Sequence, residues 1–83
     1  MKTKAIRINL ENGLDARPVA LLVQEASKYD SKIYVAYGER RINAKSIMGM
    51  MSLVLSAGSH VTVVAEGQDE DEAVDALEKF LTA

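Results

Sequence analysis

The pattern of apolar and polar residues along the chain predicts four short β-strands. Along the longer ones apolar residues recur at every second position, and this period of two places them on one face of a sheet. In the first strand Ile6, Ile8 and Leu10 share such a face, and the pair Asn12-Gly13 ends the strand. The predicted strands cover residues 4–10, 33–37, 41–43 and 61–65.

Three helices are predicted in the remaining segments. The first runs from Asp15 to about Lys28, and Pro18 lies in its first turn, where the N–H that proline lacks has no helical partner. A short second helix follows Ser46 and ends before Gly58. Apolar residues recur at helical spacing in the first and last helices. The residues expected to be buried are Val19, Leu22, Val23 and Ala26 in the first helix, and Ala73, Ala76, Leu77 and Phe80 in the last.

The last helix has the clearest signals at its ends. Asp69 and Glu72 match a capping box, in which the first side chain accepts a hydrogen bond from the start of its own helix. Acidic residues crowd the first turn and Lys79 lies near the other end, as the helix dipole favours. We therefore expect Asp69 to cap this helix.

These elements follow one another in the order β-α-β-β-α-β-α. Strands with one apolar face and helices with one apolar stripe predict an α+β fold, an open-faced β-sandwich in which a four-stranded antiparallel sheet carries three helices on one face. At 83 residues, the chain has room for one core only, so we expect a single domain over residues 1–83.

The composition narrows the classes of function. The chain has no cysteine, so it forms no disulfide and offers no thiolate to a metal or a substrate. Its net charge of −2 argues against a direct grip on nucleic acid, which depends on lysine and arginine at phosphates. The first residues lack the apolar run of a signal peptide, and no stretch is long enough to cross a bilayer. We expect a cytoplasmic protein without a membrane partner.

Two blocks of the sequence carry the candidate chemistry. Residues 13–18 read Gly-Leu-Asp-Ala-Arg-Pro, and residues 43–53 read Asn-Ala-Lys-Ser-Ile-Met-Gly-Met-Met-Ser-Leu. Together they resemble the HPr family of histidine-containing phosphocarrier proteins, and the resemblance spans nearly the whole chain. The family's fold has the order of elements predicted above. In the family, the position of Asp15 holds the histidine that carries a phosphoryl group, and the position of Ser46 holds a serine that is used for regulation.

With a serine at position 46 and no histidine at position 15, the chain resembles the Crh-like (catabolite repression HPr-like) members of the family. The resemblance implies a non-catalytic regulatory protein of carbon catabolite control, not an enzyme, with no cofactor and no metal. An HPr kinase/phosphorylase would phosphorylate Ser46 at the expense of ATP. The modified protein would then act as corepressor by binding a repressor of the catabolite control protein A type, a LacI-type transcription factor. The partner-binding residues implied by the family are Asp15, Arg17, Ile47, Met48 and Met51.

Asp15 itself allows three roles. An aspartate before a helix accepts hydrogen bonds from the free N–H groups of the first turn, so it acts as an N-cap. A carboxylate also forms acyl phosphates in some enzymes, and this chemistry would make the chain a divergent phosphocarrier. Alternatively, its permanent charge would partly imitate phosphohistidine, with about half the charge of a phosphoryl group. The only histidine, His60, opens a strand and is expected to be a surface residue rather than a substitute carrier.

Ser46 precedes a helix, so it too is expected to be an N-cap, and a phosphate there would meet the open N–H groups of that helix. The short helix cannot turn all its apolar residues inward, and we expect Met50 and Leu53 to face the sheet. Methionines left outside, beside a charge that can be switched, have the makeup of an adaptable docking patch. The residues expected outside are Ile47, Met48 and Met51.

Two further alternatives remain open on the sequence alone. The chain would be a plain HPr-like interaction domain if Ser46 were never modified. Moreover, the flexible pair Asn12-Gly13 would let the first strand exchange between two copies, so the sequence is compatible with a homo-oligomer.

Overall fold

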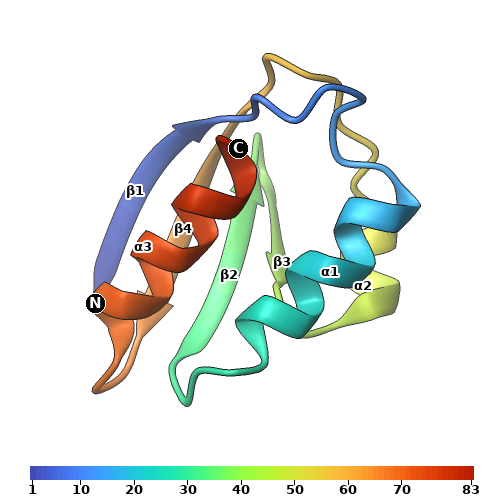
Figure 1. The fold of residues 1–83 in the computed structure, drawn as a ribbon. Coiled ribbons are helices and arrows are strands. Elements are labelled where there is room, and N and C mark those ends of the chain that lie inside the picture. The colour runs from blue at the N-terminus through green and yellow to red at the C-terminus, as the bar shows by residue number, and fades with distance from the viewer.

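The computed structural model describes all residues, 1–83, and contains the seven predicted elements in the predicted order (Figure 1). The four strands form one antiparallel sheet with the strand order β1-β4-β2-β3. The predicted fold class is therefore confirmed. The elements are β1 (Lys2–Arg7), α1 (Ala16–Ala26), β2 (Lys32–Tyr37), β3 (Arg40–Asn43), α2 (Ile47–Met51), β4 (His60–Glu66) and α3 (Glu70–Leu81).

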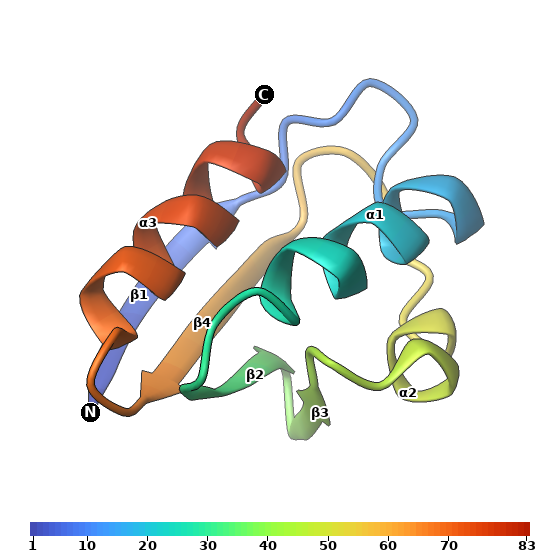
Figure 2. The same cartoon turned by 60° about the horizontal axis from the view of Figure 1, so that its bottom comes forward.

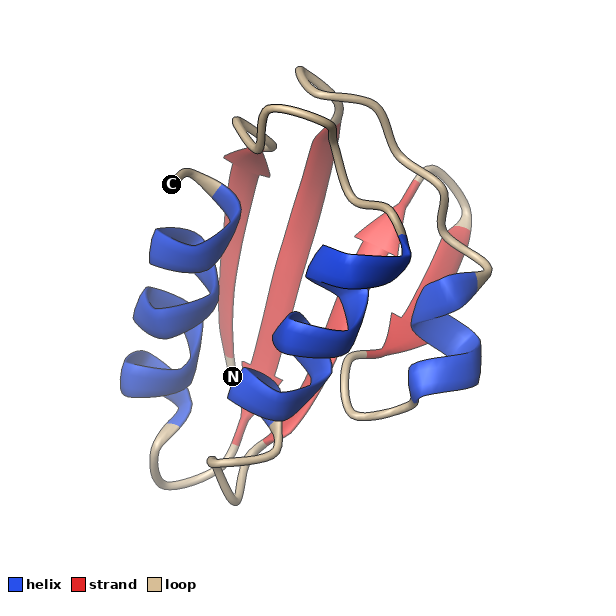
Figure 3. Ribbon diagram, turned by 45° about the vertical axis from the view of Figure 1, so that its right-hand side comes forward, coloured by secondary structure: helices blue, strands red, loops and turns tan.

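All three helices lie on the same face of the sheet, and the other face is uncovered (Figure 3). Helix α3 packs on β1 and β4, and α1 lies between α3 and α2 (Figure 2). The short helix α2 contacts α1 and the edge strand β3. Twenty buried apolar residues form a continuous core between the two layers. The sheet thus supports α1 and α2 side by side at its β3 end.

The predicted buried faces of α1 and of the α2 region are confirmed. The buried residues of α1 are Val19, Leu22, Val23 and Ala26, as expected from the helical spacing. In α2 only Met50 is buried, and Leu53, just after the helix, joins the core as well. Strand β1 ends at Arg7 and helix α1 at Ala26, both earlier than predicted, whereas β2, β3 and β4 each begin one residue earlier than predicted.

The capping box predicted at the start of α3 is wrong. The Asp69 side chain makes no hydrogen bond to its own helix. Instead it accepts hydrogen bonds from the backbone N–H of Asp30 at 2.9 Å and of Ser31 at 3.0 Å, and from the Ser31 hydroxyl. These donors belong to the turn before β2, and they attract the carboxylate away from the helix end. Asp69 therefore ties together two segments that are 38 and 39 residues apart in the sequence.

The apolar stripe of α3 is rotated from its predicted position. Ala76 and Phe80 are only half-buried, although Phe80 packs against the rim of the core. The predicted and observed stripes both fit helical spacing, so periodicity alone could not choose between them. The observed stripe is the one that packs against β1 and β4. The buried residues of α3 are Ala73, Val74, Leu77 and Leu81.

The contacts of Asp69 make the stability of the fold depend on pH. The pKa of Asp69 lies below its ordinary value, because the Ser31 hydroxyl and then the Asp30 N–H donate hydrogen bonds to the charged form. The carboxylate therefore stabilises the fold above about pH 4, the ordinary pKa of an aspartate, and this contribution is lost as the pH falls through the lowered pKa.

We expect Asp69→Asn to be less stable than the wild-type protein at neutral pH, and the difference to shrink as acid protonates the wild-type carboxylate. Urea denaturation between neutral pH and about pH 2 measures this difference. Asp71→Asn is the matched control, because Asp71 is an exposed carboxylate that lies 3.5 Å from Lys2 and contacts no backbone N–H. A loss of stability for Asp69→Asn that stays constant over the whole pH range would contradict the assignment.

Candidate docking surface and phosphorylation site

A backbone bridge holds the loop before α1 against the chain that follows α2. The N–H of Leu14 donates to the carbonyl of Leu55 at 2.7 Å, and the N–H of Leu55 donates back at 3.5 Å. The bridge depends on Gly13, which has a φ of 71° and whose Cβ, if it had one, would lie 2.2 Å from the Leu55 carbonyl oxygen. Only glycine fits there. The bridge brings Asp15, the next residue after Leu14, close to the end of α2.

Asp15 is the N-cap of α1, so the capping role is confirmed. Its backbone is extended, and its Oδ1 accepts a hydrogen bond from the N–H of Arg17 at 3.3 Å. This bond is long, and both side chains are exposed. Neither Asp15 nor Arg17 belongs to any of the ion pairs in the structure. The two charges at the start of α1 are therefore free to interact with another molecule.

Asp15 lies between two surface depressions of different character. The first is apolar, with a volume of about 140 Å³, and joins the start of α1 to the end of α2. The second is a shallow polar depression of about 340 Å³ in front of α1. The first is lined by Leu14, Asp15, Ala16, Val19, Met51, Leu53 and Val54, and the second by Leu10, Glu11, Asn12, Gly13, Asp15, Arg17 and Pro18.

Ser46 is the N-cap of α2, as predicted. Its Oγ accepts a hydrogen bond from the N–H of Gly49 at 3.1 Å, and its carbonyl accepts one from Met50 at 2.9 Å. A Cβ at Gly49 would lie 3.0 Å from a methyl group of Ile42, so glycine allows α2 to approach β3 closely. Ser46 is half-buried and lines neither depression. It lies at the end of α2 opposite Met51.

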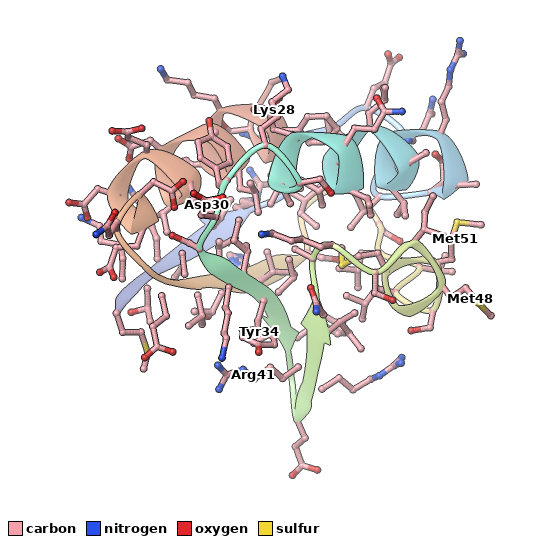
Figure 4. The ribbon with its side chains drawn as sticks, turned by 90° about the horizontal axis from the view of Figure 1, so that it is seen from below. Lys28, Asp30, Tyr34, Arg41, Met48 and Met51 are labelled. Carbon is pink, nitrogen blue, oxygen red and sulfur yellow. The ribbon has the colours of Figure 1, made fainter.

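The apolar residues of α2 divide as predicted between the core and the surface. Met50 is completely buried, whereas Ile47 is 50%, Met48 84% and Met51 47% exposed. Figure 4 shows Met48 and Met51 projecting from α2 at the edge of the molecule. Val54, which was not predicted to belong to this surface, is 82% exposed and lines the apolar depression together with Met51. We call these four exposed residues, Ile47, Met48, Met51 and Val54, the docking patch.

A signal for Val54 was present in the sequence, because it lies between two apolar residues in an extended segment. Leu53 and Leu55 are buried, so alternation turns Val54 outward. Leu21 was missed as well. It is apolar but lies off the buried stripe of α1, and half of it is exposed.

His60 is exposed at the start of β4, opposite Arg7 in the register of the sheet, and it lines neither depression. The expectation that it is a surface residue is confirmed. No three side chains of the histidine, cysteine or carboxylate type come together in a way that could hold a metal ion. No helix has the length and apolar character needed to cross a membrane.

The chain is similar to known proteins over nearly its whole length. The family model described as the PTS HPr component phosphorylation site matches residues 2–83. The chain is 47% identical to the HPr-like protein Crh of Halalkalibacterium halodurans over 98% of its own length and 96% of that protein. It is also 46% identical to the phosphocarrier protein HPr of Treponema pallidum, over 96% of its own length and 91% of that protein.

Solved structures of HPr and Crh proteins are similar to this chain as well. The crystal structure of HPr from Bacillus anthracis matches with a TM-score of 0.93 at 44% identity, covering 96% of this chain and 95% of that chain. The crystal structure of Crh from Bacillus subtilis, described as an intertwined dimer with a swapped domain, matches with a TM-score of 0.77 at 43% identity, covering 98% and 93% of the two chains. In sequence, fold and the two motif blocks alike, the chain belongs to the HPr family.

Proposed function

We propose that this protein is a non-catalytic regulator of carbon catabolite control in the cytoplasm. In this proposal an HPr kinase/phosphorylase phosphorylates Ser46, and the modified protein binds a LacI-type repressor of the catabolite control protein A type as corepressor. The observation that carries the proposal is the position of Ser46, which caps the same short helix that presents Met48 and Met51 to solvent. The similarity to a relative named HPr-like protein Crh supports it.

Phosphorylation would change the surface beside the docking patch by charge rather than by shape. The γ-phosphoryl group of ATP would pass to the Ser46 Oγ, which loses its proton to the kinase while ADP leaves. The modification adds about −1.5 to −2 charges and three acceptor oxygens. Ser46 lies outside the core cluster. A partner with arginine or lysine could then read the change through charge-assisted hydrogen bonds.

The docking patch would supply the apolar part of the contact. Methionine side chains are flexible and polarizable, so Met48 and Met51 can adapt to the surface of a partner. The apolar depression between Met51 and Asp15 gives a second, concave contact point. Arg17, which has no ion-pair partner within the chain, is available for an acidic group of the repressor.

A phosphocarrier function is the second candidate, because a relative of 46% identity is named phosphocarrier protein HPr. In this alternative Asp15 would take the phosphoryl group as an acyl phosphate. One carboxylate oxygen of Asp15 accepts the hydrogen bond from the Arg17 N–H, and this bond lowers its nucleophilicity. The Asp15 site therefore favours regulation over transfer.

Self-association by strand exchange is a further part of the proposal. The Crh of Bacillus subtilis forms an intertwined dimer with a swapped domain. In this chain β1 is an edge strand that is tied to α3 by ion pairs, among them Lys4 to Glu78 at 2.9 Å and the Met1 amino group to Glu70 at 3.1 Å. These pairs would form equally well between two chains that exchange β1.

The proposed switch at Ser46 can be tested with the kinase and the repressor. Incubation with an HPr kinase/phosphorylase and ATP should add one phosphoryl group to the protein, as measured by intact mass, and none to Ser46→Ala. Ser52→Ala, which changes the serine at the other end of α2, should still be modified. Because a charge-assisted hydrogen bond contributes roughly 1.5–3 kcal/mol, the phosphorylated protein should bind the repressor at least tenfold more tightly in calorimetry. Equal affinities for the two forms would reject the switch.

Phosphoryl transfer to this protein can be tested with the enzymes of the phosphotransferase system. Phosphoenolpyruvate and the general enzyme I of the sugar phosphotransferase system should leave no stable phosphate on the protein, because Asp15 offers no imidazole nitrogen. Asp15→His should gain acceptor activity in the same assay, since Ala16, Arg17 and Pro18 follow it as in the family. Phosphate found on wild-type Asp15 or on His60 would favour the phosphocarrier instead.

Two substitutions separate the charge of Asp15 from its capping role. Asparagine caps a helix as well as aspartate does, so Asp15→Asn should keep the stability of the fold while it removes the charge. If the charge partly imitates phosphohistidine, phosphorylated Asp15→Asn should bind the repressor roughly threefold more tightly, as expected for an exposed charge. Asp15→Ala, which also loses the cap, should be destabilised by about 1 kcal/mol in urea denaturation. Unchanged repressor affinity in Asp15→Asn would leave capping as the only role.

A further inference from the structure

Arg40, the first residue of β3, reaches across to the end of α2. Its Nη1 donates to the carbonyl oxygen of Ser52 at 3.2 Å, and its Nη2 donates to the Ser52 Oγ at 2.7 Å. The Ser52 hydroxyl in turn donates to the carbonyl oxygen of Gly49 at 2.6 Å. The guanidinium thus holds Ser52, the C-cap residue of α2, with two hydrogen bonds. The Ser52 hydroxyl links the guanidinium to a backbone carbonyl of the helix.

We propose that Arg40 is a positioning residue for the docking patch. It clamps the C-terminal end of α2 and so holds Met48 and Met51 in the orientation in which they meet a partner. This inference rests on the proposed function, since it assigns to Arg40 a part in the docking of the repressor.

Helix α2 needs such a clamp because it is very short. It has five residues, of which only Met50 is buried, and helices of this length do not persist in water without tertiary contacts. The last carbonyl groups of a helix lack partners within the helix and carry partial negative charge. The last turn of α2 contains no basic residue, so the positive charge comes from Arg40 on the neighbouring strand.

The clamp acts at the end of α2 that phosphorylation does not touch. Modification of Ser46 changes the oxygen that accepts the N–H of Gly49, and so alters the hydrogen bonding at the start of the helix. The contacts between Arg40 and Ser52 lie at the opposite end and do not involve Ser46. They keep the docking patch in place while the charge beside it changes.

Arg41 provides a matched control in the next position of the same strand. Its guanidinium lies over the ring of Tyr34, 4.3 Å from the ring centre. Figure 4 shows this pair on the side of the sheet away from the helices. Consecutive residues of a strand point to opposite faces, so replacing Arg41 removes the same charge without touching α2.

Amide hydrogen exchange tests the clamp itself, without any partner. In Arg40→Ala the amides of Met50, Ser52 and Leu53, which bond within or just after α2, should exchange about fivefold faster than in the wild type. That factor corresponds to ~1 kcal/mol at 1.4 kcal/mol per tenfold change. Arg40→Lys should restore part of the protection, since lysine keeps the charge but lacks the two-pronged fork. Arg41→Ala should exchange as the wild type does.

Binding tests the positioning role. Phosphorylated Arg40→Ala should bind the repressor about fivefold more weakly than the phosphorylated wild type, Arg40→Lys should lie between the two, and Arg41→Ala should match the wild type. If Arg40 acts through the docking patch, its replacement should cost much less affinity in a Met48→Ala/Met51→Ala background, which a double-mutant cycle measures. Ser52→Ala gives a second, milder way to loosen the clamp.

The outcomes separate this inference from the proposed function. Equal exchange rates in Arg40→Ala and Arg41→Ala would overturn the clamp. Faster exchange in Arg40→Ala with unchanged repressor affinity would reduce Arg40 to a purely structural role and overturn its part in docking. A phosphorylated wild-type protein that binds no repressor would overturn the proposed function and any role of Arg40 in docking, while the exchange rates would still decide whether the clamp exists.

Discussion

Two backbone hydrogen bonds between Leu14 and Leu55 bring the two parts of the candidate surface together. They join the loop before α1 to the segment after α2, and Gly13 makes them possible because no side chain fits against the Leu55 carbonyl. Without this bridge, Asp15 and Met51 would not line one depression. The start of one helix and the end of another become a single surface through a contact between residues that are 41 positions apart in the sequence.

The chemistry of this surface lies at helix ends, where one side chain serves structure and function together. Asp15 and Ser46 each accept a hydrogen bond from the first turn of the helix that follows. Aspartate is a good N-cap, so Asp15 is compatible with an intact fold at the position where the family is expected to hold its histidine. In the proposed function Ser46 also has two roles, because it caps α2 in its free form and receives the phosphoryl group. At the other end of α2, Arg40 donates two hydrogen bonds to the C-cap residue Ser52.

Local patterns predicted the parts of the structure that local physics decides. The buried stripe of α1 and the division of the α2 residues between core and surface follow from helical spacing, and both were predicted from the sequence. The partner of Asp69 was not, because Ser31 lies 38 residues away and no periodicity connects the two. The contact of Arg40 with Ser52 was not predicted either, because it depends on how β3 and α2 pack against each other. The motif blocks, by contrast, located the candidate site before its geometry was known.

The most direct measurement of the central claim uses the methyl groups of the four methionines as reporters. Protein labelled with ¹³C at these methyls would be titrated with the repressor before and after phosphorylation of Ser46, and followed by NMR. Met48 and Met51 should shift at much lower repressor concentrations in the phosphorylated protein, while Met50, which is fully buried, and Met1, at the start of the chain beside α3, should stay in place. Shifts of Met48 and Met51 that are equal without phosphorylation, or absent with it, would contradict the account.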